Sequence, residues 1–329
     1  MTTRYSWQLL RAGRFLLDGG GMFGVIPKVV WSRAVPCDEQ NRVELHHNCL
    51  LLDSTDNAKR TVLIEAGTGD KLDAKMSKIF GLDAVTIESA LRDAGRDPAE
   101  IRHAIVSHLH FDHAGGLTRR CREGETPDWT AQHPHESSGD ADGVCLTFPN
   151  AEVICQAREW KDALANDAVM TRTYYADHLK PLLKPLPKGN DRVRTVDAME
   201  PFPPGMTPHR DESPSSTLEE RCVEILPGVR VFRVPGHTWG QQAVWFTDDH
   251  GREIVFTPDL MPTVHHVGAA YSLSYDVEPY TAMVTKRWFL HEAAERGWLL
   301  VLDHEPGVPT VRVRRNAKGW YDLDPEEIA

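Results

Sequence analysis

Short apolar runs separated by polar turns dominate the chain and predict a protein rich in strands. Runs of four to eight apolar or alternating residues, bounded by Gly, Pro, Asn or Asp, are typical of buried or half-buried strands. A helix is predicted over residues 86–94, with Thr86 as its N-cap and Gly95 as its stop. Residues 158–183 are expected to be mostly helical. After one or two strands over 4–17, further strands are predicted at 43–52, 61–64, 101–107, 151–155, 229–234, 253–256, 298–302 and 311–315.

Three stretches interrupt this pattern. The glycine triplet at 19–21 predicts a tight or mobile loop that carries Met22 and Phe23. For these two side chains, packing on the core and forming an apolar wall for a substrate are equally open. Residues 118–147 predict an exposed polar insertion, in which His133 and His135 are expected in a solvated loop. Residues 200–220 predict a second, proline-rich insertion, expected as a surface loop, with a lid or a dimer contact as alternatives.

Composition and charge narrow the class of protein. A chain of 329 residues with 41% hydrophobic and 26% charged residues predicts a single large α/β domain over 1–329, with those two insertions. The net charge of -11 argues against a nucleic-acid partner. No apolar run is long enough for a membrane span, and the N-terminus lacks the apolar core of a signal peptide. Six scattered cysteines without a C-x-x-C pair predict reduced, mostly buried thiols and a cytoplasmic location.

The strongest chemical signal follows the apolar run at 104–106. It places His108, His110, Asp112 and His113 within six positions, in the pattern H-x-H-x-D-H. Because side chains alternate in an extended segment, the first three start on one side and His113 starts on the other. Imidazole nitrogen and carboxylate oxygen suit zinc, iron and related divalent metals. A turn with ordinary surface histidines is the competing interpretation, and this density of ligand types argues against it.

The same arrangement, a strand followed by a ligand, returns three times. His237, Asp259 and His304 each stand just beyond the end of a predicted apolar strand, where sites gather in layered α/β folds. Each signal is weak alone, but together they complete two coordination shells. Glu65 could support a bound histidine, although we expect a surface carboxylate there. The predicted shells are His108, His110 and His237 for one metal, Asp112, His113 and His304 for the other, and Asp259 as a bridge.

These residues give the chain a family resemblance. It resembles the metallo-β-lactamase superfamily through the motif at 108–113, through Pro235-Gly236-His237-Thr238, and through Asp259 and His304. The resemblance implies a four-layer αββα sandwich with a dinuclear metal site on one rim. The stretches 18–28, 259–263 and 275–279, together with His266, look like the branch of N-acyl-homoserine lactone lactonases and methyl parathion hydrolase.

Two positions qualify that resemblance. Class B1 and B2 β-lactamases use a cysteine near the position of Asp259, and its absence argues against β-lactam hydrolysis. Many lactonases of the family carry a tyrosine where this chain has Pro262. His266 could supply the missing donor, and a hydrogen-bonded loop histidine is the equally open alternative.

The expected function is hydrolysis by two divalent metal ions, zinc first, with iron, manganese or cobalt as alternatives. A bridging hydroxide would attack the carbonyl of a lactone or related ester, Asp112 would move the proton, and Met22 and Phe23 would face the small-molecule substrate. An organophosphate triesterase and a glyoxalase-II-like thioesterase are the alternatives. A tRNA-processing nuclease is disfavoured by the charge, and a non-enzymatic scaffold by the complete ligand set. A homodimer is compatible with the sequence.

Overall fold

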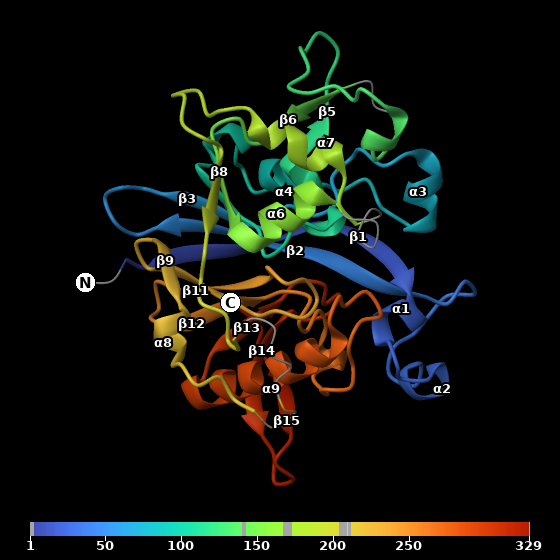
Figure 1. Ribbon diagram of the computed structural model, residues 1–329, viewed down its shortest axis with the longest axis vertical. Coiled ribbons are helices and arrows are strands. Elements are labelled where there is room, and N and C mark those ends of the chain that lie inside the picture. The colour runs from blue at the N-terminus through green and yellow to red at the C-terminus, as the bar shows by residue number, and fades with distance from the viewer. Residues whose placement is uncertain (1–2, 140–142, 167–172, 204–208, 210–211, 329) are drawn as a thin grey trace. The chain divides into compact units, whose positions relative to one another are not determined.

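The computed structural model describes residues 3–139, 143–166, 173–203, 209 and 212–328. The chain divides into two compact units. Unit 1 comprises residues 1–5, 16–46 and 197–329, and unit 2 comprises residues 6–15 and 47–196. Each unit is built on one large sheet with helices, so the predicted mixed α/β class is confirmed (Figure 1).

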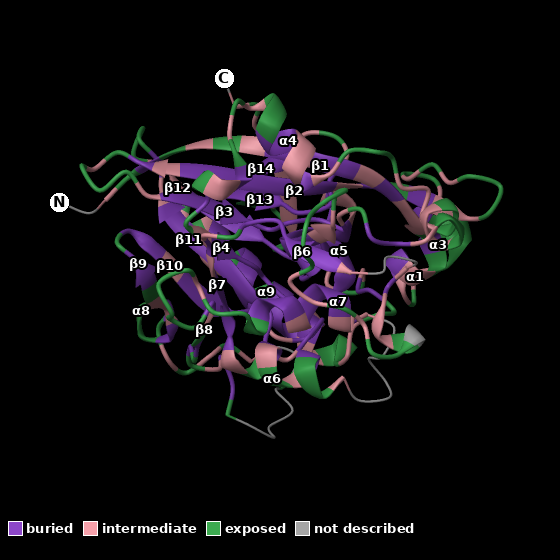
Figure 2. Ribbon diagram, turned by 90° about the horizontal axis from the view of Figure 1, so that it is seen from above, coloured by how far each residue is buried: buried purple, intermediate pink, exposed green. Residues whose placement is uncertain are grey.

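The sheet that lies mostly in unit 2 has the strand order β1-β2-β3-β4-β7-β8, and the ends of β1 and β2 that fall within 16–46 belong to unit 1. Its strands are parallel from β3 to β8, whereas β2 and β3 pair antiparallel. Figure 2 shows β3, β4 and β7 as largely buried, which explains their nearly continuous apolar sequences. The strands are β1 (Tyr5–Asp18), β2 (Arg42–Ser54), β3 (Thr61–Ile64), β4 (His103–Ile105), β7 (Glu152–Gln156) and β8 (Val193–Val196).

Short helices connect these strands. The predicted helix is confirmed as α4, and Thr86 caps it in a capping box with Ser89. Gly95 follows with a left-handed φ of 73°, as expected for a helix stop. The region from 158 to 183 is helical in three described pieces, α6, α7 and η4. The elements are α3 (Ala74–Ile79), α4 (Ile87–Asp93), η1 (Pro98–Glu100), α5 (Phe111–Ala114), η2 (Gly115–Leu117), η3 (Pro134–Glu136), α6 (Ala157–Ala165), α7 (Ala176–Leu179) and η4 (Lys180–Leu183).

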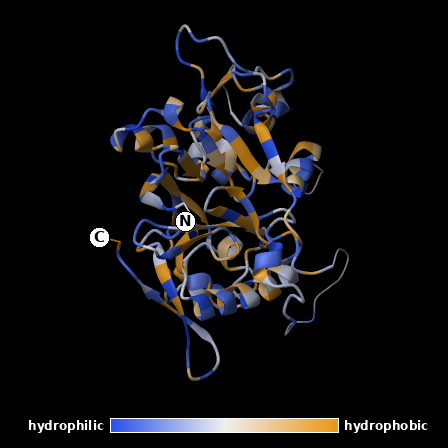
Figure 3. Cartoon of the chain, turned by 90° about the vertical axis from the view of Figure 1, so that its left-hand side faces the viewer, coloured by the Kyte–Doolittle hydropathy of each residue, from blue (hydrophilic) through white to orange (hydrophobic). Residues whose placement is uncertain are grey.

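Unit 1 carries a sheet of order β15-β14-β13-β12-β11-β10-β9. All neighbours are antiparallel except β12 and β13, which run parallel. Figure 3 shows hydrophobic segments in the strands of the sheets. The elements are α1 (Gly19–Phe23), α2 (Lys28–Trp31), α8 (Leu218–Arg221), β9 (Val223–Leu226), β10 (Val229–Arg233), β11 (Gln242–Thr247), β12 (Glu253–Thr257), η5 (Val264–His266), α9 (Pro279–Arg296), β13 (Leu299–Leu302), β14 (Thr310–Arg315) and β15 (Tyr321–Pro325).

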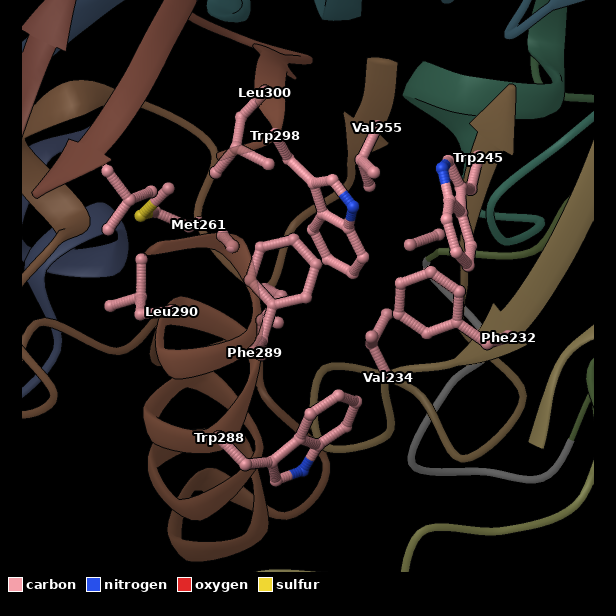
Figure 4. Packing of buried hydrophobic residues seen from close by; sticks show 14 of the residues in the cluster. Phe232, Val234, Trp245, Val255, Met261, Trp288, Phe289, Leu290, Trp298 and Leu300 are labelled. Atoms are coloured by element: carbon pink, nitrogen blue, oxygen red, sulfur yellow. The ribbon is translucent and has the colours of Figure 1, made fainter. Parts of the chain in front are cut away.

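Helix α9 was not predicted, and it covers the sheet of unit 1. Consecutive buried residues such as Trp288 and Phe289 point to different sides of the helix, so the sequence shows no single apolar stripe. Both rings pack with Phe232, and Phe289 also packs with Trp298, in an aromatic core (Figure 4). Aromatic pairs of this kind contribute about 0.5–1.5 kcal/mol each beyond the area they bury.

The two predicted insertions are better anchored than expected. The first begins and ends in a two-stranded sheet of β5 (Thr118–Arg120) and β6 (Val144–Leu146), which a disulfide between Cys121 and Cys145 joins. The prediction of reduced cysteines is therefore wrong for this pair, because the sequence did not show that residues 24 apart meet across two strands. His133 is exposed, as expected for a loop.

His135 is exposed as well, in η3. At the second insertion, Phe202 and Leu218 join the core of unit 1, so its flanks are not plain surface loop. Residues 140–142, 204–208 and 210–211 lie outside the described part of the chain.

Among the described helices, none combines the length and the apolar character that crossing a bilayer requires.

The glycine triplet is also structured differently from the prediction. It forms the first turn of α1, where the Asp18 side chain accepts a hydrogen bond from the Gly21 amide at 3.0 Å. A Cβ on Gly19 would lie 2.3 Å from the Trp31 ring, and one on Gly21 would lie 1.9 Å from the Tyr275 hydroxyl. The glycines therefore allow close packing, not a mobile loop.

Candidate metal centre

Unit 2 presents the H-x-H-x-D-H motif at the end of β4. The chain leaves the strand, His110 occupies the N-cap position of α5, and Asp112 and His113 lie within this short helix. All four ligand-type side chains are buried, with His108 fully enclosed. We call His108, His110, Asp112 and His113 the His108 group.

The imidazoles of this group face one another. His108 Nε2 lies 3.1 Å from His110 Nδ1, and the ring centroids of His108 and His113 are 3.9 Å apart. Asp112 Oδ1 lies 3.8 Å from His113 Nε2. Three histidines packed this closely in a buried place, next to a carboxylate, form a donor set that suits a divalent cation.

Glu65 contacts two residues of the motif segment and is buried, so the expectation of a surface carboxylate is wrong. Its side chain is buried and accepts a hydrogen bond from the Ser107 amide at 2.6 Å, while its other oxygen lies 3.2 Å from His113 Nδ1. Its backbone has a φ of 67°, in the left-handed region that costs a non-glycine residue energy. A histidine held at one nitrogen by a carboxylate is oriented to bind a metal through the other.

Unit 1 places its ligand-type residues just after three strands, as predicted. His237 follows β10, Asp259 follows β12 and His304 follows β13. The two oxygens of Asp259 face two different histidines: Oδ2 lies 3.1 Å from His237 Nε2 and Oδ1 lies 3.3 Å from His304 Nε2. Each oxygen of this carboxylate therefore faces one imidazole, and the bridging role stays a prediction. We call these three residues, with Asp303, the His237 group.

The remaining nitrogens of these two histidines are also held. His237 Nδ1 lies 2.9 Å from Asp276 Oδ1, and His304 Nδ1 lies 2.9 Å from the His46 carbonyl oxygen. A carbonyl only accepts, so His304 donates from Nδ1 and directs Nε2 toward Asp259. Burial lowers the pKa of His237, but Asp259 and Asp276 outweigh it and raise the pKa to about 10. The same negative potential favours a bound cation.

Two carboxylates of unit 1 were not assigned a role from the sequence. Asp303 offers an oxygen within 4.8 Å of ligand atoms of Asp259 and His304, and Asp276 orients His237 as described above. Asp303 directly precedes His304 at the end of the same apolar strand, so the strand-then-ligand pattern could have included it. Asp276 lies 39 positions from its partner, and no local pattern reveals that pairing.

Met22 and Phe23 line a cavity of about 300 Å³ in unit 1. Its walls are mainly apolar and also include Val43 and Leu45, with Thr263, His265 and His266 among the polar residues. The two side chains are thus buried, as the core-packing alternative expects, and they also line this cavity. Contact with a substrate stays a prediction. This cavity is a candidate place for the apolar part of a ligand.

His266 is fully engaged in that wall. Its Nε2 donates to the Met22 carbonyl oxygen at 2.8 Å, its Nδ1 lies 2.8 Å from Thr263 Oγ1, and its ring stacks on Phe23. Burial, reinforced by the Lys286 ammonium, lowers the pKa of His266 to about 3, so the ring is neutral at pH 7. Donation to a substrate would require an exchange of one of these hydrogen bonds, and a catalytic role for His266 stays a prediction.

Comparison with known proteins agrees with this donor chemistry. Residues 42–304 match the family described as the metallo-beta-lactamase superfamily. A curated relative, the N-acyl homoserine lactonase AttM of Azorhizobium caulinodans, is 31% identical over 119 residues, which are 32% of this chain and 43% of that protein. The matches therefore span less than half the length of the first curated relatives.

Solved structures show the same fold at low identity. A probable metal-dependent hydrolase from Staphylococcus aureus is 22% identical, with a TM-score of 0.72 over 100% of both chains. AidC, a dizinc quorum-quenching lactonase in complex with a homoserine product, is 15% identical, with a TM-score of 0.67 over 100% of this chain and 97% of that one.

Proposed function

The chain belongs to the metallo-β-lactamase superfamily of hydrolases, and from this premise we propose that it uses two divalent metal ions to hydrolyse a lactone or related ester. One observation carries the proposal. In His113, His237 and His304 one ring nitrogen is held by a carboxylate or a carbonyl, and Nε2 is turned toward a carboxylate. Such partners fix the tautomer and orientation of metal-binding histidines.

The proposed ligands are the seven that the sequence indicates. His108, His110 and His237 would hold one ion, Asp112, His113 and His304 the other, and Asp259 would bridge them. The proposed bridging role is supported by the two oxygens of Asp259, because each lies near a different histidine of unit 1. Asp303 adds a carboxylate beside His304. We propose zinc as the metal, because histidine nitrogen and carboxylate oxygen dominate the donor set.

When bound, a metal pair supplies a nucleophile from water at neutral pH and polarises the substrate oxygen. The residues of the chain do the rest. Asp112, buried beside His113, is placed to accept and return a proton at its carboxylate. Glu65 and Asp276 hold two histidines in position. Met22 and Phe23 provide an apolar wall that excludes water.

We propose an N-acyl-homoserine-lactone-like substrate. The cavity beside Met22 and Phe23 is apolar and about 300 Å³, at the lower end of the range for ligand pockets. Two residues that line the cavity are close in sequence to residues of the proposed metal centre. Leu45 precedes His46, whose carbonyl oxygen accepts from His304, and Pro306 stands two residues after His304. A short acyl chain fits this space, and the curated relatives named as lactonases support the same class.

The structure disfavours the thioesterase alternative. A glutathione thioester would call for an available cationic patch, and strand β14 carries three arginines, Arg312, Arg314 and Arg315. Acidic partners already occupy two of them, because Arg312 binds Glu326 at 2.6 Å and Arg314 binds Asp324 at 3.1 Å. The organophosphate alternative has no specific observation in its favour and becomes an arm of the test.

A hydrolysis panel on metal-reconstituted protein tests the proposal. We expect N-acyl-homoserine lactones to give the highest kcat/KM, followed by simple esters, with thioesters and phosphotriesters far lower. The activity should disappear with a chelator and return with zinc. Turnover of a phosphotriester above every lactone would replace the proposed substrate, and undiminished turnover after complete metal removal would contradict the metal-dependent mechanism.

A further inference from the structure

A second buried carboxylate, Glu159, contacts the metal-binding motif of unit 2. It lies in the first turn of α6 and is fully enclosed. Its Oε1 accepts two hydrogen bonds, one from the Leu109 amide at 2.9 Å and one from the Tyr174 hydroxyl at 2.9 Å. Leu109 is the residue between His108 and His110, so Glu159 holds the centre of the H-x-H segment.

Glu65 and Glu159 bind alternate amides of the same segment. Glu65 accepts from Ser107 and Glu159 accepts from Leu109. Each peptide group joins two neighbouring residues, so holding the amides of Ser107 and Leu109 restricts the directions in which His108 and His110 leave the backbone. Buried carboxylates accept hydrogen bonds from amides strongly, because the bonds are charge-assisted and shielded from water.

Tyr174 connects this carboxylate to the His110 ring. The two ring centroids lie 5.1 Å apart with an interplanar angle of 55°. The Tyr174 hydroxyl donates to the Glu159 carboxylate at 2.9 Å. The tyrosine ring is thus fixed at its hydroxyl and limits the orientations open to His110.

We propose that Glu159, acting through the Leu109 amide and through Tyr174, is a positioning residue that holds His108 and His110 in their metal-binding orientation. This inference rests on the metal centre of the proposed function and is independent of the substrate. Removal of a residue in this role weakens metal binding about 10- to 100-fold. A residue that only stabilises the core lowers the melting temperature without a specific effect on metal affinity.

The experiment compares three variants with a matched control. E159A removes both hydrogen bonds, E159Q keeps an acceptor oxygen but no charge, and Y174F removes only the hydroxyl. D177A is the control, because Asp177 is an equally buried acid of unit 2 whose carboxylate accepts from the amide and hydroxyl of Ser138. Zinc affinity is measured by competition with a chromophoric chelator, and the melting temperature of each metal-free protein is recorded separately.

E159A is expected to lose about 10- to 100-fold in zinc affinity, with E159Q between it and the wild type. D177A should melt earlier yet bind zinc as the wild type does. Unchanged zinc affinity in a folded E159A overturns the inference. If E159A does not fold, a several-fold loss in E159Q or Y174F supports the inference, and wild-type affinity in both overturns it. A wild-type protein that binds none of zinc, iron, manganese and cobalt overturns the proposed function itself.

Discussion

The two groups of ligand-type residues reach similar chemistry by different routes. The His108 group comes from one continuous segment. Carboxylates hold its backbone, by accepting from the amides of Ser107 and Leu109, and Glu65 also holds one of its imidazoles, that of His113. The His237 group is assembled from the ends of three strands, and its carboxylates face the imidazoles themselves. The contiguous motif therefore has carboxylates on its peptide groups as well as on a side chain, whereas the scattered group is held by contacts between its side chains.

The largest effect is expected from the residue that ties the scattered group together. D259A should lower kcat/KM by about a thousandfold or more and reduce the content of both metals, because its two oxygens face two histidines. H108A should lower activity by a similar factor but deplete mainly one metal. Turnover with metal analysis of the purified variants checks both. Full activity with both metals retained in D259A would break the comparison.

A smaller effect is expected from the partner of His237. D276N removes the charge that holds Nδ1 of His237, and we expect a 10- to 100-fold loss of metal affinity with the fold preserved. E65Q is the counterpart in unit 2. It keeps an oxygen that can accept from Ser107 and is expected to lose less. Chelator competition on both variants compares them, and an equal loss would show that the two groups are supported alike.

His266, which belongs to neither group, is expected to make the free energy of unfolding depend on pH. The pKa of His266 is lowered to about 3 in the native state, against about 6.5 when unfolded. The unfolded chain therefore binds a proton that the native chain does not, and this contribution to stability falls as the pH drops from about 6.5 toward 3. The slope is about 1.4 kcal/mol per pH unit. H266Q should remove that slope in denaturant unfolding of the metal-free protein, and an unchanged slope would be inconsistent with a buried neutral ring.

Much of the fold follows from local pattern. Strands β2, β3, β10, β12 and β13 are confirmed near their predicted bounds, because buried strands carry short apolar runs between turn residues. Helix α9 was missed, since its buried residues surround it. The short helix α1 was missed because its glycines suggested a loop, while their small size serves packing against Trp31 and Tyr275.

The residues of the candidate site also fall into those that the sequence predicts and those that it does not. The ligand-type residues stand at strand ends, where a sequence pattern can find them. Their partners depend on contacts between distant segments: Glu159 meets Leu109 across 50 positions, and Asp276 meets His237 across 39. The disulfide between Cys121 and Cys145 is of the same kind, because it depends on two strands pairing. Pairings of this type need the three-dimensional structure.

The most direct test of the proposed metal centre is anomalous diffraction at the zinc edge from crystals of the zinc-loaded protein. Two zinc peaks are predicted, one bound by His108, His110 and His237 and the other by Asp112, His113 and His304, with Asp259 at both. The proposed metal centre would be contradicted by a map in which no zinc ion is bound by residues of both groups. In such a map, His237, Asp259 and His304 would contact no ion that the His108 group also contacts.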